Sequence, residues 1–198
     1  MKIKDFFSLS SKLSSSTVQA HPTDLNIDHL KLIKGDYTRI DFPVIFKQEY
    51  GNKLRDMLDT GLVGLFLISD RMKTILEENN LTGWKTFPIK IYDENGDEIT
   101  GYHGFSIIGR SGPINYEKSE IIEKRLVPTG PISKYYKGIF IDKWDEMDFF
   151  SPDKKYRTFI TKKAADILKK SKLTNIRLEN LAEKEIDVSN VKKDFNDT

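Results

Sequence analysis

The apolar positions between residues 67 and 84 follow the order of a strand end, a short helix and a return to extended chain. An apolar run ends at Ile68, and apolar residues then recur at the three- and four-residue spacing of a helix face. The apolar residues on this face are Met72, Ile75 and Leu76. Ser69 precedes them, and its hydroxyl can accept a hydrogen bond from a backbone N–H of the first turn. We therefore predict a helix that begins after Ser69.

The same order recurs 92 residues later, over residues 159–176. Thr161 occupies the position of Ser69, and a Leu-Thr pair follows each helix, at residues 81–82 and 173–174. The apolar face of the second helix would consist of Ala164, Ile167 and Leu168. This correspondence favours an internal duplication that gives two equivalent amphipathic helices. The alternative is the general likeness of any two amphipathic helices.

The remaining patterns are mostly those of short strands. Residues 40–46 alternate apolar and polar side chains, and Pro43 indicates a strand at the edge of a sheet. Residues 62–68 form a continuous apolar run, which is typical of a buried strand, and the Asn-Gly pair at residues 95–96 predicts a hairpin. Residues 53–58 have the pattern of a short helix. Together these elements predict an α+β fold with a mostly antiparallel sheet.

The two ends of the chain differ from the middle in composition. Residues 8–16 contain six serines and only two leucines, which predicts a flexible or loosely held segment. Residues 184–198 form a charged tail with few apolar side chains to bury, and we expect it to be flexible. A length of 198 residues suits one domain, which we place at residues 1–183.

Composition limits the classes of function. The chain is 38% hydrophobic and 31% charged, as in an ordinary globular protein, with a formal net charge of +2. This balance gives no general attraction to nucleic acid or to a membrane surface. The absence of cysteine excludes disulfides, thiol catalysis and thiolate metal sites. Because the sequence shows neither a signal-peptide pattern nor an apolar run of about 20 residues, we predict a cytoplasmic protein.

No motif of an active site or a cofactor site stands out. The three histidines, His21, His29 and His103, lack the spacing of metal ligands, which favours structural roles. The acidic run at residues 93–98 lacks the glycine position and the distal glutamate of a calcium loop, and residues 109–112 lack the lysine of a P-loop. The sequence therefore contains no convincing active site, and we predict no cofactor; an enzyme with an unrecognised site is the third hypothesis for the function.

One surface feature is a cluster of lysines on the second helix. They are Lys162, Lys163, Lys169, Lys170 and Lys172. Such a face could contact a phosphate backbone, so a nucleic-acid-associated binding protein is the alternative function. Nucleic acid is the less favoured partner, because interleaved arginine and aromatic residues are missing and a solvated helix face explains the lysines more simply.

A second surface feature is the segment 141–150, which mixes acidic and aromatic residues. Large aromatic side chains can anchor a protein interface, and carboxylates can steer a basic partner towards it. The candidate partner-binding residues in this segment are Asp142, Trp144, Asp145, Glu146 and Asp148. The alternative is that the aromatic side chains fill the core while the acids face water.

The order of these motifs resembles a family of small bacterial immunity proteins found with polymorphic toxin systems. Members of that family show V-S-E-R before the first helix, F-x-P-V after it, and an acidic W-D-G-S-D-I-F-like segment before a second helix with L-T-G-I. The matching positions in this chain are residues 68–71, 87–89, 144–150 and 173–176. The resemblance covers about residues 60–183.

The resemblance implies a non-enzymatic protein that binds and neutralises a cognate toxin by occlusion. It does not identify the toxin. The chain departs from the family pattern where Glu146-Met147 replaces Gly-Ser, which puts the tight turn expected at that point in question.

Overall fold

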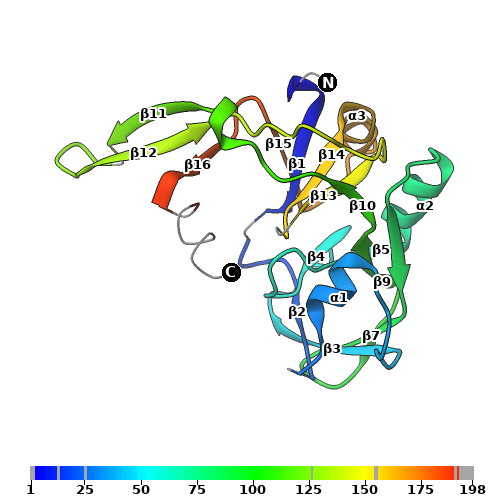
Figure 1. Cartoon of the computed structure of the whole chain (residues 1–198). Coiled ribbons are helices and arrows are strands. Elements are labelled where there is room, and N and C mark those ends of the chain that lie inside the picture. The colour runs from blue at the N-terminus through cyan, green and yellow to red at the C-terminus, as the bar shows by residue number, and fades with distance from the viewer. Residues whose placement is uncertain are drawn as a thin grey trace.

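The computed structural model describes residues 3–12, 14–24, 26–125, 127–153, 156–189 and 191. These residues form sixteen strands in three sheets, three α-helices and two short 3-10 helices (Figure 1). The α-helices are α1 (His29–Lys34), α2 (Asp70–Glu78) and α3 (Lys162–Lys170), and the 3-10 helices span Ile3–Asp5 and Tyr116–Lys118. None of the helices in these ranges is both long enough and apolar enough to cross a bilayer.

The largest sheet has eight strands. In spatial order they are β6 (Trp84–Phe87), β9 (Tyr102–Ile107), β5 (Phe66–Ser69), β4 (Met57–Asp59), β2 (Gln19–Pro22), β3 (Val44–Tyr50), β7 (Ile89–Tyr92) and β8 (Glu98–Ile99). The hairpin predicted at residues 95–96 is confirmed, because β7 and β8 pair antiparallel with Ile91 opposite Ile99.

Two smaller sheets complete the fold. The five-stranded sheet has the order β10 (Gly109–Ser111), β13 (Phe149–Pro152), β14 (Thr158–Thr161), β1 (Phe6–Ser11) and β15 (Ile176–Asn180). The three-stranded sheet has the order β11 (Glu120–Arg125), β12 (Ile132–Lys137) and β16 (Glu185–Asp187). Its β11–β12 hairpin extends away from the rest of the molecule, at the left of Figure 1.

One hydrophobic cluster connects α2 and α3 to both larger sheets. Its buried members include Met72, Leu76, Phe105, Phe149, Ala164 and Leu168. Buried side chains of α2 and α3 belong to this one cluster, so both helices pack against a shared core. The candidate site lies at residues 142–148, directly before β13, and Phe149 of β13 is a member of this cluster.

The predicted α+β fold with two equivalent helices is wrong, because the described chain is mostly β. Both helices occur where the sequence predicts them, but each has only nine residues. The described chain contains sixteen strands, so the helices are a small part of the fold. Burial agrees at the three matched positions, since Met72 and Ala164 are buried, Ile75 and Ile167 are half-buried, and Leu76 and Leu168 are buried. The helices differ in that α3 also buries Ala165. The strands escaped notice because several, such as β11, are exposed on both faces and show no alternation of apolar and polar residues.

Residues 53–58 do not form the predicted helix. They lead into β4, and the backbone N–H of Asp56 donates to Oγ1 of Thr174 at 2.8 Å. A contact across 118 residues leaves no trace in local periodicity. The strand predicted at residues 40–46 begins only at Val44, and β3 lies between β2 and β7, so the edge position inferred from Pro43 is wrong as well.

Several other segments differ from their predicted extent. The strand predicted at residues 62–68 begins only at Phe66 and ends one residue later, at Ser69. The serine-rich segment 8–16 includes the last four of the six residues of β1, which pairs with β14 on one side and β15 on the other. The predicted tail, residues 184–198, includes β16 at Glu185–Asp187, while residue 190 and residues 192–198 lie outside the described residues.

Candidate functional site

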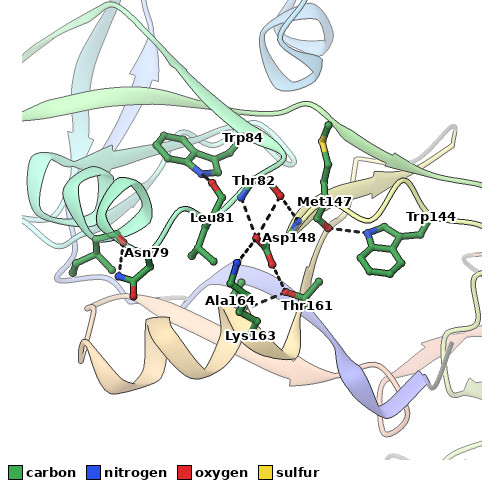
Figure 2. Close-up of polar contacts among 11 residues, drawn as sticks. Asn79, Leu81, Thr82, Trp84, Trp144, Met147, Asp148, Thr161, Lys163 and Ala164 are labelled. Atoms are coloured by element: carbon green, nitrogen blue, oxygen red, sulfur yellow. Dashed lines mark hydrogen bonds and ion pairs between the residues drawn. The ribbon is translucent and has the colours of Figure 1, made fainter.

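Residues 142–148 form a turn that is stabilised by contacts with the rest of the protein and within the turn itself. An isolated antiparallel bridge joins Trp144 to Ser111, and strand β13 begins directly after the turn. The indole of Trp144 packs edge-on against Phe6, with ring centroids 5.2 Å apart. Its N–H donates to the carbonyl oxygen of Met147 at 2.8 Å (Figure 2). The indole therefore holds the two sides of the turn together.

Glu146 occupies the position at which the family pattern has glycine. Its φ is +67°, in the left-handed region that favours glycine. The carboxylate of Asp145 accepts a hydrogen bond from the N–H of Met147 at 3.2 Å, which supports the same turn. The tight turn is therefore present although its glycine is not, at a conformational cost of about 1 kcal/mol.

Asp148 is the buried centre of a hydrogen-bonded cluster (Figure 2). Its side chain is 9% exposed, and its Oδ1 accepts from the hydroxyl of Thr161 at 2.9 Å. Its Oδ2 accepts from the N–H of Thr82 at 3.1 Å and lies 3.2 Å from Nζ of Lys163. The hydroxyl of Thr161 also accepts from the N–H of Ala164 and so caps α3. Asp148 thus ties the start of α3 to the chain that leaves α2.

A second buried carboxylate makes the corresponding contacts. The Asp56 side chain is 8% exposed, and its Oδ1 accepts from the hydroxyl of Ser69 at 3.0 Å. Its Oδ2 lies 2.8 Å from Nη1 of Arg71 and accepts from the N–H of Thr174 at 2.7 Å. The hydroxyl of Ser69 accepts from the N–H of Met72 and caps α2. Each carboxylate therefore supports one helix and reaches the turn that follows the other.

The caps predicted at Ser69 and Thr161 are confirmed. The sequence patterns did not single out Asp56, and they indicated Asp148 as a partner-binding residue and not as a buried support of a helix cap. A signal for them exists in the sequence. Asp56 precedes Ser69 by 13 residues, and Asp148 precedes Thr161 by the same number. The threonine of each Leu-Thr pair is the residue that the opposite carboxylate binds.

The structure separates the five candidate partner-binding residues by exposure. The exposed members are Asp142, Asp145 and Glu146, whereas Trp144 is half-buried and Asp148 is buried. The segment is thus a surface turn at its start and part of the core at its end. Only the exposed members present carboxylates to solvent. The carboxylate of Asp148 instead binds Thr82 and Thr161 in the interior and so fixes the end of the turn.

The charge of Asp142 is held by two neighbours. The Lys118 ammonium forms an ion pair with this carboxylate, and Nδ2 of Asn115 donates to it at 2.8 Å. These two hydrogen bonds, with that from Lys118 the larger effect, lower the pKa of Asp142 below its ordinary value. The carboxylate is therefore ionised at neutral pH.

A cleft of about 750 Å³ opens beside the turn, at the N-terminal end of α3. The residues that line it include Asp5, Phe6, Lys143, Trp144, Glu146 and Lys162. Phe6 and Trp144 contribute aromatic surface to the lining, and Asp5, Lys143, Glu146 and Lys162 contribute charged groups. Such a shape suits the insertion of one side chain from a partner protein.

The lysines of α3 are largely engaged with the protein itself. Lys162 forms an ion pair with Asp166, and Lys163 reaches the buried carboxylate of the cluster described above. The Nζ atom of Lys169 lies 4.6 Å from the ring centroid of Phe7. This local pairing favours a solvated helix face over a surface that binds a phosphate backbone.

The histidines form no recognisable catalytic or metal centre within the described residues. Nε2 of His103 lies 2.7 Å from Oδ1 of Asp70 at the start of α2, but no hydroxyl group of the described residues is hydrogen-bonded to this imidazole. No described group of three histidine, aspartate or glutamate side chains is arranged to hold a metal ion.

A comparison with protein families gives a match that covers most of the chain. The family model described as Immunity protein family (Imm11) matches residues 11–183. This match confirms the resemblance inferred from the motifs, and its span includes the turn at residues 142–148 and both aspartate-centred clusters. No curated protein matches the chain.

Proposed function

The chain belongs to the Imm11 immunity protein family, and we propose that it binds and neutralises a cognate bacterial toxin by occluding it, without catalysis of its own. The observation that carries this proposal is the family match over residues 11–183. Family membership supports the general role, and the rigid acidic turn supports a mode of action by binding.

We propose that the toxin contacts the surface turn, which we define as residues 142–146, and the cleft beside it. The carboxylates of Asp142, Asp145 and Glu146 are exposed there and would attract a basic toxin surface. Internal hydrogen bonds hold the turn in place before any partner arrives, so binding would cost little ordering entropy.

Glu146 is the sharpest position for a test. It is exposed and makes no hydrogen bond or ion pair with another described residue, whereas Asp145 supports the turn through the N–H of Met147. Reversing the charge of Glu146 therefore changes the surface with little effect on the fold. Glu94, an exposed residue of the hairpin at residues 95–96, provides a matched control on another surface.

The experiment is a surface-kinetics measurement with a purified toxin encoded beside this chain, at low and high salt. Glu146→Lys should slow association and reduce its dependence on salt, because exposed interface charges act mainly on the association rate. Glu94→Lys should behave as the unchanged protein does. If all three proteins bind with equal kinetics, the toxin contacts another surface; if none binds or protects cells from the toxin, the proposed function is wrong.

A test of the cleft at Trp144 requires a conservative substitution, because this residue also packs against the core. Its ring packs against Phe6 and Phe150, so Trp144→Ala removes packing from the core as well as a wall of the cleft. Trp144→Phe keeps an aromatic ring but loses the N–H that binds Met147. A faster dissociation of the toxin from Trp144→Phe, at an unchanged melting temperature, would support insertion of a toxin side chain into the cleft.

A further inference from the structure

The β11–β12 hairpin is unusually exposed for a pair of strands. Five of the six residues of β11 are exposed, and the hairpin extends away from the other two sheets (Figure 1). Two apolar side chains on it, Ile121 and Ile132, are 58% and 52% exposed. Ile121 pairs with Tyr136 and Ile132 pairs with Arg125, so these two side chains lie at opposite ends of the β11–β12 ladder and do not form one patch.

The outer side of β11 is a free sheet edge. The strand order β11–β12–β16 leaves β11 with one strand neighbour among the described residues. An unpaired edge presents a row of backbone N–H and C=O groups that can bind another strand. At six residues, β11 is long enough for several such hydrogen bonds.

The hydrogen bonding of β12 shows which groups of β11 point outward. The N–H of Gly138 donates to the carbonyl oxygen of Lys184. Backbone N–H and C=O groups alternate in direction along a strand, so those of every second residue before Gly138 point towards β16. The backbone groups of Tyr135 therefore point towards β11, where Tyr135 is paired with Ile122. The backbone groups that point away from the sheet belong to Ile121, Glu123 and Arg125.

We propose that β11 pairs antiparallel with β11 of a second copy of this chain, with a two-fold axis through Ile122. Outward-pointing residues must pair with one another, so Ile121 lies opposite the partner's Glu123. In this register Glu120 lies opposite the partner's Lys124, and the symmetry makes that ion pair twice. Shifting the strand to centre the axis on Glu123 would place two like charges opposite each other, which is unfavourable.

The sequence of β11 is the reason to choose a second copy over a different protein. The strand reads Glu-Ile-Ile-Glu-Lys-Arg, with an acidic start and a basic end. Antiparallel pairing of such a strand with itself brings opposite charges together. Lys124 also binds Glu185 and Glu123 pairs with Lys134 within one chain, so the contact between copies adds to ion pairs that already exist. The proposed pairing uses the outer edge of β11 and not the surface turn at residues 142–146, although Ile121 lines one cleft together with Asp142 and Lys143.

The dimer should be weak and concentration-dependent. One strand pair buries less than the roughly 1,200 Å² of stable protein interfaces, so we expect association in the micromolar range or weaker. Sedimentation velocity of the full chain over a wide range of concentrations would measure it. A protein that remains monomeric at the highest concentration would overturn the proposal.

Complementary charge variants test the register. Glu120→Lys should abolish dimers, because it places a lysine opposite the partner's Lys124. Lys124→Glu should do the same by bringing two acids together, and its melting temperature must be compared with that of the unchanged chain, because it also removes the ion pair with Glu185. An equal mixture of these two variants should dimerise again, since each chain then offers the charge that the other needs. Glu117→Lys, outside the strand, is the matched control and should dimerise as the unchanged chain does. Failure of the mixture to dimerise would overturn this register.

A proline variant tests the edge itself. The N–H of Glu123 points outward, so Glu123→Pro removes intermolecular hydrogen bonds while keeping the β11–β12 ladder. The variant should be monomeric, and its melting temperature should stay close to that of the unchanged protein, because the ion pair with Lys134 that it removes is exposed. Dimers that persist in both Glu123→Pro and Glu120→Lys would place the interface elsewhere and overturn the proposal. A monomeric wild-type protein whose toxin binding is weakened by Glu123→Pro would overturn it too, by assigning the edge to the toxin.

Discussion

The backbone N–H groups of Thr82 and Asp148 each donate to the side chain of the other residue, across 66 residues of sequence. The N–H of Thr82 donates to Oδ2 of Asp148 at 3.1 Å, and the N–H of Asp148 donates to Oγ1 of Thr82 at 3.1 Å. Thr174 and Asp56 make the corresponding exchange across 118 residues, at 2.7 and 2.8 Å. Through these pairs, the end of each helix unit is bound to the segment that precedes the other helix.

The first prediction concerns the buried carboxylates. Asp148→Asn and Asp56→Asn should each lower the free energy of unfolding by about 2–4 kcal/mol, because an amide oxygen cannot serve all the donors that surround the carboxylate. Urea unfolding would measure the change. Asp166→Asn, which affects only an exposed ion pair with Lys162, should cost less than about 0.5 kcal/mol. Equal effects at buried and exposed positions would contradict the role assigned to the two clusters.

The second prediction concerns the helix caps. Ser69→Ala and Thr161→Ala should each destabilise the protein by about 0.5–2 kcal/mol. We expect values in the upper part of that range, because each hydroxyl also donates to a buried carboxylate. Thr161→Ser keeps the hydroxyl and should retain most of the stability. Unchanged urea midpoints in both alanine variants would show that the hydroxyls do not support the helices.

The third prediction concerns backbone strain at Glu146. Because its φ is +67°, Glu146→Gly should be more stable than Glu146→Ala by about 1 kcal/mol. Lys143, in the same turn, is not among the residues with positive φ, so glycine should be less stable than alanine there. Thermal unfolding of the four variants would reveal the opposite signs. The same order at both positions would argue against a strained turn.

The fourth prediction concerns stability at alkaline pH. Burial, with a further effect of the Asp56 carboxylate, raises the pKa of Tyr102 from 10 to about 12. The folded state therefore keeps its proton more tightly than the unfolded state. The resulting stabilisation is complete below pH 10 and is lost as the pH rises towards about 12.

Urea midpoints measured below and within that window would test this effect. The unchanged protein should lose stability more steeply than Tyr102→Phe, which has no hydroxyl to ionise. Asp56→Asn should move the onset of ionisation of Tyr102 to lower pH, because it removes one cause of the raised pKa. Parallel pH profiles for the unchanged protein and Tyr102→Phe would contradict the assignment.

The fifth prediction concerns nucleic acid. The net charge of +2 and the local pairing of the α3 lysines should allow only weak association with DNA or RNA. That association should fall steeply between about 50 and 200 mM salt, since it depends on the release of counterions. Tight, sequence-specific binding at the higher salt concentration would favour the alternative function.

The sequence by itself was sufficient where the signal is local. The helices after Ser69 and Thr161 and the hairpin at residues 95–96 were predicted correctly, because a cap, a helical period and an Asn-Gly turn act over only a few residues. The family was also accessible, since its motifs are short and occur in a fixed order.

The tertiary structure decided what depends on distant partners. Residues 8–11 look like a loose serine segment, yet they belong to a central strand, because β14 and β15 satisfy their backbone hydrogen bonds. Asp145 and Asp148 carry the same chemical group, but one is exposed and the other is buried beside Thr82. Strand formation and burial are set by neighbours that lie far away along the chain, so no local pattern could have shown that the fold is mostly β.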